Sequence, residues 1–196
     1  VALPVVFQPE LRRALEHIGR GRLFHSNRMI SEEELAHMLD EIIPLTAGLS
    51  KTKTGALLVF DREVGLNEII DTGIQIDGLV SKELLGNIFI PNTPLHDGAV
   101  VIREGRIMAA GCLLPLTTDR SLSTELGTRH RAAIGISEKS DAVVVVVSEE
   151  TGAVSYTYGG HIYRHLTDEG LRKTLEGFFS KRPQGWVNFL KRRSDK

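Results

Sequence analysis

The sequence predicts an α/β fold in which a central mixed β-sheet is flanked by helices on both faces. Short continuous apolar runs, typical of strands buried on both faces, alternate with segments whose apolar residues recur at helical spacing. Some consecutive strands are separated by only a few residues, which indicates hairpins within the same sheet. With 196 residues, of which 41% are hydrophobic, the chain is long enough to bury one sizeable core.

Two helices are expected first. Pro9 can begin a helix over residues 9–19. Ser31 and Glu34 form a capping-box pattern at the start of the second helix, and apolar residues then recur at helical spacing. Pro44 lacks a backbone donor, so we expect it to kink or stop this second helix.

The strands and the remaining helices follow. Strands are expected at residues 55–60, 74–77, 99–102, 107–114, 142–147 and 153–156. Helices are expected at residues 81–88, 128–136 and 171–179. The runs 99–102 and 107–114 flank Glu104-Gly105 and predict a hairpin. Residues 91–98, which lead into this hairpin, are too rich in Pro, Asn and Gly to be regular.

Composition limits the classes of partner and site. Lys and Arg total 24 against 25 for Asp and Glu, so the chain has no overall positive field and we expect no nucleic-acid partner. The single cysteine, Cys112, excludes an intramolecular disulfide framework and a cysteine-rich zinc site. No apolar run approaches the ~20 residues needed to cross a bilayer, so we expect the chain itself to be soluble.

The first segment that could carry chemistry is His96-Asp97-Gly98-Ala99. A carboxylate on a loop at the mouth of a sheet can accept a proton from a hydroxyl, bind a divalent cation, or do both. Gly98 and Ala99 leave room for a ligand to approach the backbone. The alternative for Asp97 is an ordinary Asp-Gly turn, and the alternative for His96 as a metal ligand is a structural role.

The second segment is Gly127-Thr128-Arg129-His130-Arg131. If Thr128 caps the helix, its hydroxyl and the first free amides form an anion site, to which Arg129 and His130 add donors and charge. Successive helical residues are rotated by about 100°, so Arg129 and Arg131 point about 200° apart and cannot both grip one phosphate. The alternative is a solvated basic turn.

The third segment is Ser148-Glu149-Glu150, which follows the most apolar strand of the chain. Adjacent carboxylates at this position could hold a metal that bridges phosphate oxygens, and Ser148 could donate a hydrogen bond to a phosphate. The alternative is an exposed hairpin turn.

Taken together, four segments in this order and with these separations resemble the diadenylate cyclase domain. They are Gly55-Ala56-Leu57, Asp97-Gly98-Ala99, Arg129-His130-Arg131 and Ser148-Glu149-Glu150. The resemblance runs from about residue 55 to residue 179, and the segment that begins Phe7-Gln8-Pro9 is similar to the one that follows the membrane helices in the membrane-anchored bacterial class. It implies an enzyme that condenses two ATP molecules into cyclic di-AMP and releases two pyrophosphates, with each ribose 3′-hydroxyl attacking the other nucleotide's α-phosphate across a face-to-face homodimer.

The resemblance also implies site residues. The catalytic residues would be Asp97, Arg129 and His130. The substrate-binding residues would be Gly55, Ala56, Leu57, Gly98, Ala99, Leu113, Leu114, Thr128, Arg129, His130, Ser148, Glu149 and Glu150. The divalent metal, Mg²⁺ or Mn²⁺, would be held by His96, Asp97 and Glu150. Some family members carry an aromatic residue at the position of Leu113, where it stacks on adenine; here the contact would be apolar only.

The same resemblance implies an organisation and partners. Residues 1–30 would be a helix and linker that follow missing membrane helices, residues 31–180 the catalytic domain, and residues 181–196 a charged tail. The full-length protein would lie at the cytoplasmic face of the bacterial cell membrane, where a membrane-bound regulator protein and phosphoglucosamine mutase are candidate partners. Two alternatives from other classes are a nucleotide-binding sensor without turnover and a nucleotidyltransferase that uses another acceptor.

Overall fold

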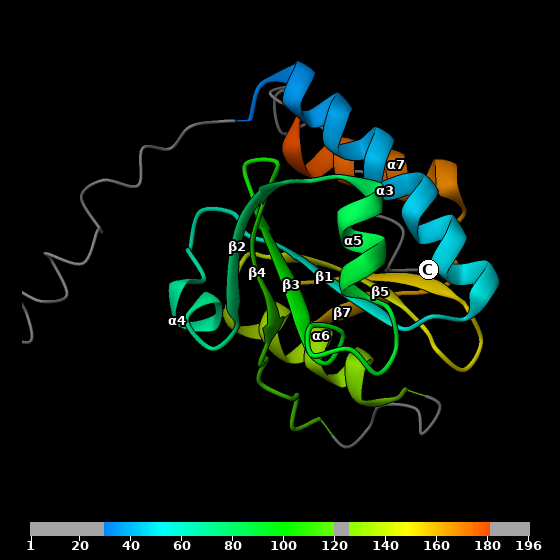
Figure 1. Ribbon diagram of the computed structural model, residues 1–196. Coiled ribbons are helices and arrows are strands. Elements are labelled where there is room, and N and C mark those ends of the chain that lie inside the picture. The colour runs from blue at the N-terminus through cyan, green and yellow to red at the C-terminus, as the bar shows by residue number, and fades with distance from the viewer. Residues whose placement is uncertain (1–29, 120–125, 181–196) are drawn as a thin grey trace, which may run out of the picture.

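The computed structural model describes residues 30–119 and 126–180, and within them the α/β class is confirmed (Figure 1). Seven strands form one mixed sheet in the order β2-β4-β3-β1-β5-β6-β7. The strands are β1 Ala56–Phe60, β2 Ile74–Leu79, β3 Ala99–Arg103, β4 Arg106–Cys112, β5 Val143–Val147, β6 Val154–Tyr158 and β7 His161–Tyr163. The helices are α3 Glu32–Thr52, α4 Asn67–Ile70, α5 Lys82–Ile88, α6 Thr128–Lys139 and α7 Asp168–Phe179. The helix predicted over residues 9–19 and the tail 181–196 lie outside the described residues.

Helices cover both faces of the sheet, as predicted. Alternate residues of β1 separate the core into two halves, because successive side chains of a strand point to opposite faces. Leu58 and Phe60 pack in the half formed with α3, α5 and α7, whereas Leu57 and Val59 pack in the half formed with α4 and α6. All five residues of β1 are buried, which explains why this strand reads as a continuous apolar run.

Helix α3 begins as predicted but does not stop where predicted. Ser31 and Glu34 form the full capping box. Of the two outcomes predicted at Pro44, a kink or a stop, the stop is wrong, because the helix continues through it to Thr52. Pro44 itself is exposed, while Leu45 and Leu49 beyond it are buried in the same core as the residues before it. Burial of two leucines contributes about 1.5–3 kcal/mol each, enough to offset the roughly 3 kcal/mol that a proline costs inside a helix.

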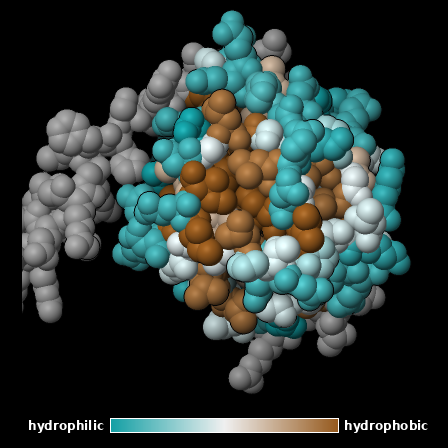
Figure 2. All heavy atoms as spheres, viewed as in Figure 1, coloured by the Kyte–Doolittle hydropathy of each residue, from teal (hydrophilic) through white to brown (hydrophobic). Residues whose placement is uncertain are grey.

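Figure 2 shows apolar side chains gathered at the centre of the face seen in Figure 1, with hydrophilic side chains around them. The exposed large hydrophobic residues of the described chain include Ile74 and Leu79 on the edge strand β2 and Leu113 and Leu116 after β4. None of the helices among residues 30–119 and 126–180 has the length and hydrophobicity required to cross a membrane.

Strand directions bring three of the four segments of the resemblance to one edge of the sheet. Strands β1 and β3 are parallel, with Leu58 opposite Val100, so the residues before both strands lie at the same edge. Strand β5 runs antiparallel to β1, with Ala56 opposite Val147, so the turn that follows β5 lies at that edge as well. The segments around residues 55, 97 and 149 therefore meet, although they are far apart in the sequence.

Candidate active site

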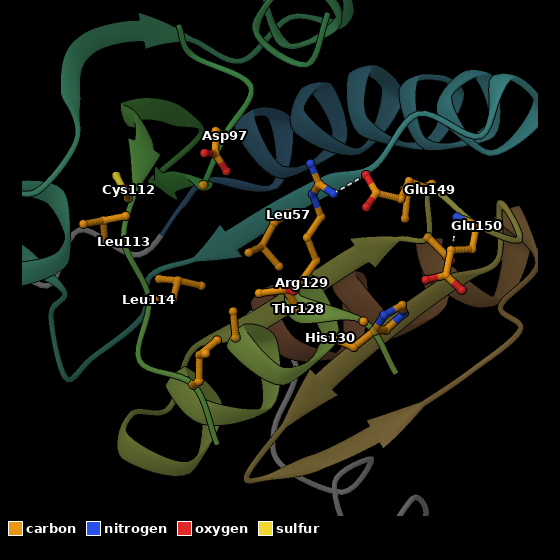
Figure 3. Close-up of a pocket in the computed structure, with 16 residues that line it drawn as sticks. Leu57, Asp97, Cys112, Leu113, Leu114, Thr128, Arg129, His130, Glu149 and Glu150 are labelled. Carbon is orange, nitrogen blue, oxygen red and sulfur yellow. Dashed lines mark hydrogen bonds and ion pairs between the residues drawn. The ribbon is translucent and has the colours of Figure 1, made fainter. Parts of the chain in front are cut away.

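A cleft of about 330 Å³ opens at this edge of the sheet, a volume within the range of small-molecule sites. Its apolar lining residues are Leu57, Cys112, Leu113, Leu114, Leu116 and Ala132. Its polar lining residues include Asp97, Thr128, Arg129, His130, Glu149 and Glu150, with Ser148 beside the two glutamates. Leu113 and Leu114 lie on one side of the cleft in Figure 3, and Glu149 and Glu150 lie on the other. Figure 3 shows Asp97 and Glu150 at opposite ends of the cleft, with Arg129 between them.

The Asp97 end of the cleft is shaped by a tight loop. Residues 91–98 contain no helix or strand, as predicted. Gly98 has φ +112°, and a Cβ there would lie 2.7 Å from the carbonyl oxygen of Cys112, so the loop sits directly against the end of β4. The Asp97 side chain is exposed and has no hydrogen-bond or ion-pair partner within the described part of the chain. Both carboxylate oxygens are available to a ligand.

His96 is bound within the same loop. Its Nδ1 lies 2.6 Å from the carbonyl oxygen of Thr93, and its Nε2 lies 3.4 Å from the backbone nitrogen of Asn92. These contacts are compatible with one tautomer, in which Nδ1–H donates and Nε2 accepts. His96 does not line the cleft, and a metal at its ring would have to displace one of these two hydrogen bonds.

Helix α6 points its N-terminus at the cleft. The N-cap is Gly127, so the expectation that Thr128 caps the helix is wrong. Thr128 is the first helical residue, and its exposed side chain lines the cleft instead of closing the helix end. The amides of a first helical turn lack intrahelical acceptors and favour a negative charge, so this end of α6 suits an anion.

The central feature among the polar lining residues is an ion pair. Arg129 Nη1 lies 2.5 Å from Glu149 Oε2, drawn as a dashed line in Figure 3. The Arg129 side chain is 23% exposed and that of Glu149 is 61% exposed. Arg131 does not line the cleft, in agreement with the predicted divergence of the two arginines around the helix.

His130, the residue after Arg129 in α6, is buried and interacts with two charged groups. Burial lowers its pKa from the ordinary value of 6.5, the positive charge of Arg164 lowers it further, and the negative charge of Glu150 opposes both. The imidazole is therefore held neutral at pH 7, with one ring nitrogen able to donate a hydrogen bond and the other able to accept one.

The turn after β5 is organised by its own hydrogen bonds. The Ser148 hydroxyl accepts from the backbone N–H groups of Glu150 and Thr151, at 3.3 and 3.2 Å. The Ser50 hydroxyl at the end of α3 donates to the carbonyl oxygen of Gly152 at 2.6 Å, which fastens the turn to that helix. Ser148 still has its own hydroxyl hydrogen to donate to a ligand.

The residues that form this cleft lie within a region that matches a known protein family. A family model described as "DAC: DisA bacterial checkpoint controller nucleotide-binding" matches residues 46–162, which include all four segments of the resemblance. The chain belongs to the diadenylate cyclase (DAC) family.

Individual DAC proteins are similar over most of this chain. It is 49% identical over 181 residues to a protein of Bacillus subtilis named cyclic di-AMP synthase CdaA, and 49% identical over 175 residues to a Listeria monocytogenes protein named diadenylate cyclase. These alignments cover 92% and 89% of this chain but 66% and 64% of the relatives, so the chain spans just under two thirds of their length.

Solved structures give the same result. The crystal structure of a double mutant of DacA from Staphylococcus aureus superposes with a TM-score of 0.74 at 44% identity, over 76% of this chain and 99% of that one. A structure titled as a hypothetical membrane spanning protein from Bacillus cereus has a TM-score of 0.63 at 45% identity, over 65% of this chain and 63% of that one.

The DAC cleft contains most, but not all, of the residues that the sequence singled out. Four do not line it: His96, Gly55, Ala56 and Ala99. Ala56 and Ala99 are fully buried in β1 and β3, while Gly55 lies beneath Arg129. Gly127, predicted only as part of the second candidate segment, also lines the cleft. Four further lining residues were not predicted, namely Cys112, Leu116, Ala132 and Val147. Cys112 and Val147 neighbour predicted residues in sequence, and Ala132 lies one helical turn beyond Thr128 on the same face of α6.

The carboxylates of the cleft fit a metal that takes part of its coordination from a substrate. Within residues 30–119 and 126–180, no group of three or more His, Cys, Asp or Glu side chains is placed to hold an ion. Figure 3 shows Asp97 and Glu150 at opposite ends of the cleft, with Arg129 between them, so each carboxylate is a separate candidate ligand. Mg²⁺ is commonly held by one or two carboxylates together with phosphate oxygens and water, so either end of the cleft offers a suitable oxygen donor.

Proposed function

We propose that this chain is a diadenylate cyclase, which condenses two ATP molecules into cyclic di-AMP and two pyrophosphates. The observation that carries the proposal is the cleft itself, which offers leucines to a nucleobase on one side and polar donors and carboxylates to phosphates on the other, with the Asp97 carboxylate at one end. Membership of the DAC family and the names of the bacterial relatives support the same activity.

The apolar and polar lining residues would contact different parts of the nucleotide. Leu57 and Leu114 would contact the adenine, and Leu113, which is 68% exposed, would cover it from the rim. The first turn of α6, with Arg129 and the neutral His130, would hold the triphosphate through amide, guanidinium and imidazole donors. Ser148 would donate its hydroxyl hydrogen to a phosphate oxygen, and Gly98 would form part of the wall beside the ribose.

Asp97 would act on the ribose 3′-hydroxyl. The 3′-oxygen forms a bond to the α-phosphorus of the second ATP, the bond from that phosphorus to the bridging oxygen of pyrophosphate breaks, and the hydroxyl proton passes to the Asp97 carboxylate. Two such displacements close the ring and release two pyrophosphates. Because little covalent chemistry is left to the protein, most of the acceleration would come from positioning and charge neutralisation.

Two copies of the chain are needed for this geometry. One cleft holds one ATP, and each 3′-hydroxyl must attack a nucleotide bound elsewhere. A two-fold homodimer with facing clefts brings the two nucleotides together antiparallel, because a two-fold axis places the same surface of each copy opposite itself. We expect specific activity to fall when the enzyme is diluted below its dimerisation constant; constant specific activity in a demonstrably monomeric sample would refute this.

A divalent metal, Mg²⁺ or Mn²⁺, would be held by Asp97 or by Glu150 with the phosphate oxygens of the substrate. It would neutralise charge that develops on the phosphates as pyrophosphate leaves. His96 would join it only if the ring gave up a hydrogen bond to the loop. The protein's own contribution is to hold each carboxylate at its end of the cleft.

Mass spectrometry of the products tests the proposal. The chain is incubated with ATP and Mg²⁺ or Mn²⁺, and cyclic di-AMP is the expected product. Asp97→Asn should abolish turnover while thermal unfolding is nearly unchanged, whereas Asp71→Asn, an exposed carboxylate outside the cleft, should leave both unchanged. ATP bound without turnover would indicate a sensor, and an adenylylated acceptor would indicate a different nucleotidyltransferase.

For the whole protein, we propose a location at the cytoplasmic face of the membrane. A membrane-bound regulator and phosphoglucosamine mutase are the proposed partners. Both proposals rest on resemblance to the membrane-anchored class. Co-purification of either protein with the full-length enzyme from membranes would support them, and recovery of the enzyme alone from the soluble fraction would contradict them.

A further inference from the structure

Gly55 lies beneath the ion pair that crosses the cleft. A Cβ built on Gly55 would be 2.8 Å from both Cζ and Nη1 of Arg129 and 3.1 Å from Oε2 of Glu149. Gly55 is not among the described glycines with positive φ, so its backbone does not itself demand a glycine. Glycine is required here because the Arg129 guanidinium and the Glu149 carboxylate occupy the space in which a Cβ would lie.

The backbone around this contact is held on every side. Ala56 pairs with Val147 across β1 and β5, which places Gly55 next to the start of the turn that carries Glu149. Ser50 binds the far end of the same turn through its hydrogen bond to Gly152. The end of α3, the start of β1 and the turn after β5 are therefore fixed relative to one another. Only the ends of the Arg129 and Glu149 side chains can move to make room for an added methyl group.

We propose that Gly55 is a positioning residue, which allows the Arg129 guanidinium and the Glu149 carboxylate to lie together over the start of β1. In this position Glu149 holds one edge of the guanidinium and leaves its other N–H groups directed at an anionic substrate. This role differs from a contact with the nucleoside, and it rests on the proposed function in so far as the anion is the triphosphate of ATP.

The geometry predicts what a methyl group at this position does. Because the atoms that it would meet all lie at the ends of side chains, the Gly55→Ala protein should fold normally. Its added methyl group should displace the Arg129 guanidinium from its position over residue 55. A displacement of about 1 Å at a substrate-positioning group can cost about 100-fold in rate, and we expect a loss of that order in kcat/KM for ATP. The matched control is Gly48→Ala on the exposed side of α3, where a Cβ has nothing within 4 Å.

A double-mutant cycle separates positioning from a general structural effect. Gly55→Ala and Arg129→Ala are made singly and together, and kcat and KM for ATP are measured with Gly48→Ala alongside. If Gly55 acts through Arg129, adding Gly55→Ala to the Arg129→Ala protein changes kcat/KM by less than about twofold, since the group that it displaces is already absent. The proposal is overturned if Gly55→Ala retains wild-type activity or lowers it by the same factor in both backgrounds.

A crystal structure of Gly55→Ala supplies a measurement that does not depend on activity. The expected result is a guanidinium separated from the Glu149 carboxylate, with β1, β5 and α6 in place. An Arg129–Glu149 pair in its original position would overturn the proposal, as would a Gly55→Ala protein that fails to fold in both backgrounds. If the wild-type chain makes no cyclic di-AMP, the proposed function fails, but this structure still decides the role of Gly55.

Discussion

Gly98→Ala is the substitution whose cost can be worked out most directly from the structure. Gly98 has φ +112°, a conformation that L residues rarely adopt. A Cβ at this position would also lie 2.7 Å from the carbonyl oxygen of Cys112 and 2.8 Å from the carbonyl carbon of Gly111. Both of these are backbone atoms in or beside β4, so no side-chain rotation can relieve the contact.

Two costs add for this variant. A non-glycine residue held at a sparsely populated positive φ costs about 1–3 kcal/mol. An added methyl that forces the backbone to move costs about 1–3 kcal/mol more. The sum, about 2–6 kcal/mol, is large against the 5–15 kcal/mol by which domains are usually stable. Because Gly98 follows Asp97 directly, any relief of the contact also moves the carboxylate, so we expect turnover to fall as well.

Urea unfolding followed by circular dichroism measures the cost, with two matched controls. Gly65 has φ +74° and nothing within 4 Å of its would-be Cβ, so Gly65→Ala carries the strain without the contact. Gly48→Ala introduces neither a strained φ nor a close contact. The difference between Gly98→Ala and Gly65→Ala reports the backbone contact, about 1–3 kcal/mol, together with the extra strain of φ +112° over φ +74°. The reasoning is refuted if the two variants lose the same free energy of unfolding.

Three further predictions concern groups away from the nucleotide's reacting atoms. Burial raises the pKa of the Cys112 thiol to about 11, so the reactive thiolate is scarcer in the folded protein. At pH 8 we expect the folded protein to react with a thiol reagent at least about a hundredfold more slowly than the urea-unfolded chain, and equal rates would contradict this. Arg103→Leu should lower the free energy of unfolding by about 3–5 kcal/mol, because it leaves the buried Asp61 carboxylate without its ion-pair partner. Replacing both Arg103 and Asp61 by leucine should lower it less, and a larger loss in this double variant would contradict the reasoning. Folding lowers the pKa of His130, so the unfolded chain binds a proton more readily, and the contribution of the neutral imidazole to the free energy of unfolding, present above pH 6.5, is lost as the pH falls. The wild type should therefore lose more free energy of unfolding than His130→Asn between pH 7.5 and pH 5, and equal losses in the two proteins would contradict this.

Local patterns in the sequence predicted most of the elements. The capping box at Ser31 and the cap at Ser81 involve residues only three apart, so they form independently of the rest of the fold. Six strands were predicted from apolar runs or from alternation of apolar and polar residues, and the hairpin between β3 and β4 from its short connection. The short strand β7 and the short helix α4 were not predicted. The two errors, at Pro44 and Thr128, arose where packing or a neighbouring residue outweighed the local preference. In the first case buried leucines on both sides keep the helix intact, and in the second Gly127 takes the N-cap position.

The α/β class, the three candidate segments and the family could all be predicted from the sequence. The tertiary structure places β1 between a parallel β3 and an antiparallel β5, which brings the segments around residues 97 and 149 to one edge of the sheet, where the first turn of α6 completes the cleft. It also decided that Arg129 pairs with Glu149 over Gly55, and that both ring nitrogens of His96 are engaged within its loop. The reason is physical: capping and apolar periodicity depend on neighbours a few residues away, whereas strand order and ion pairing depend on the burial of many side chains from distant segments at once.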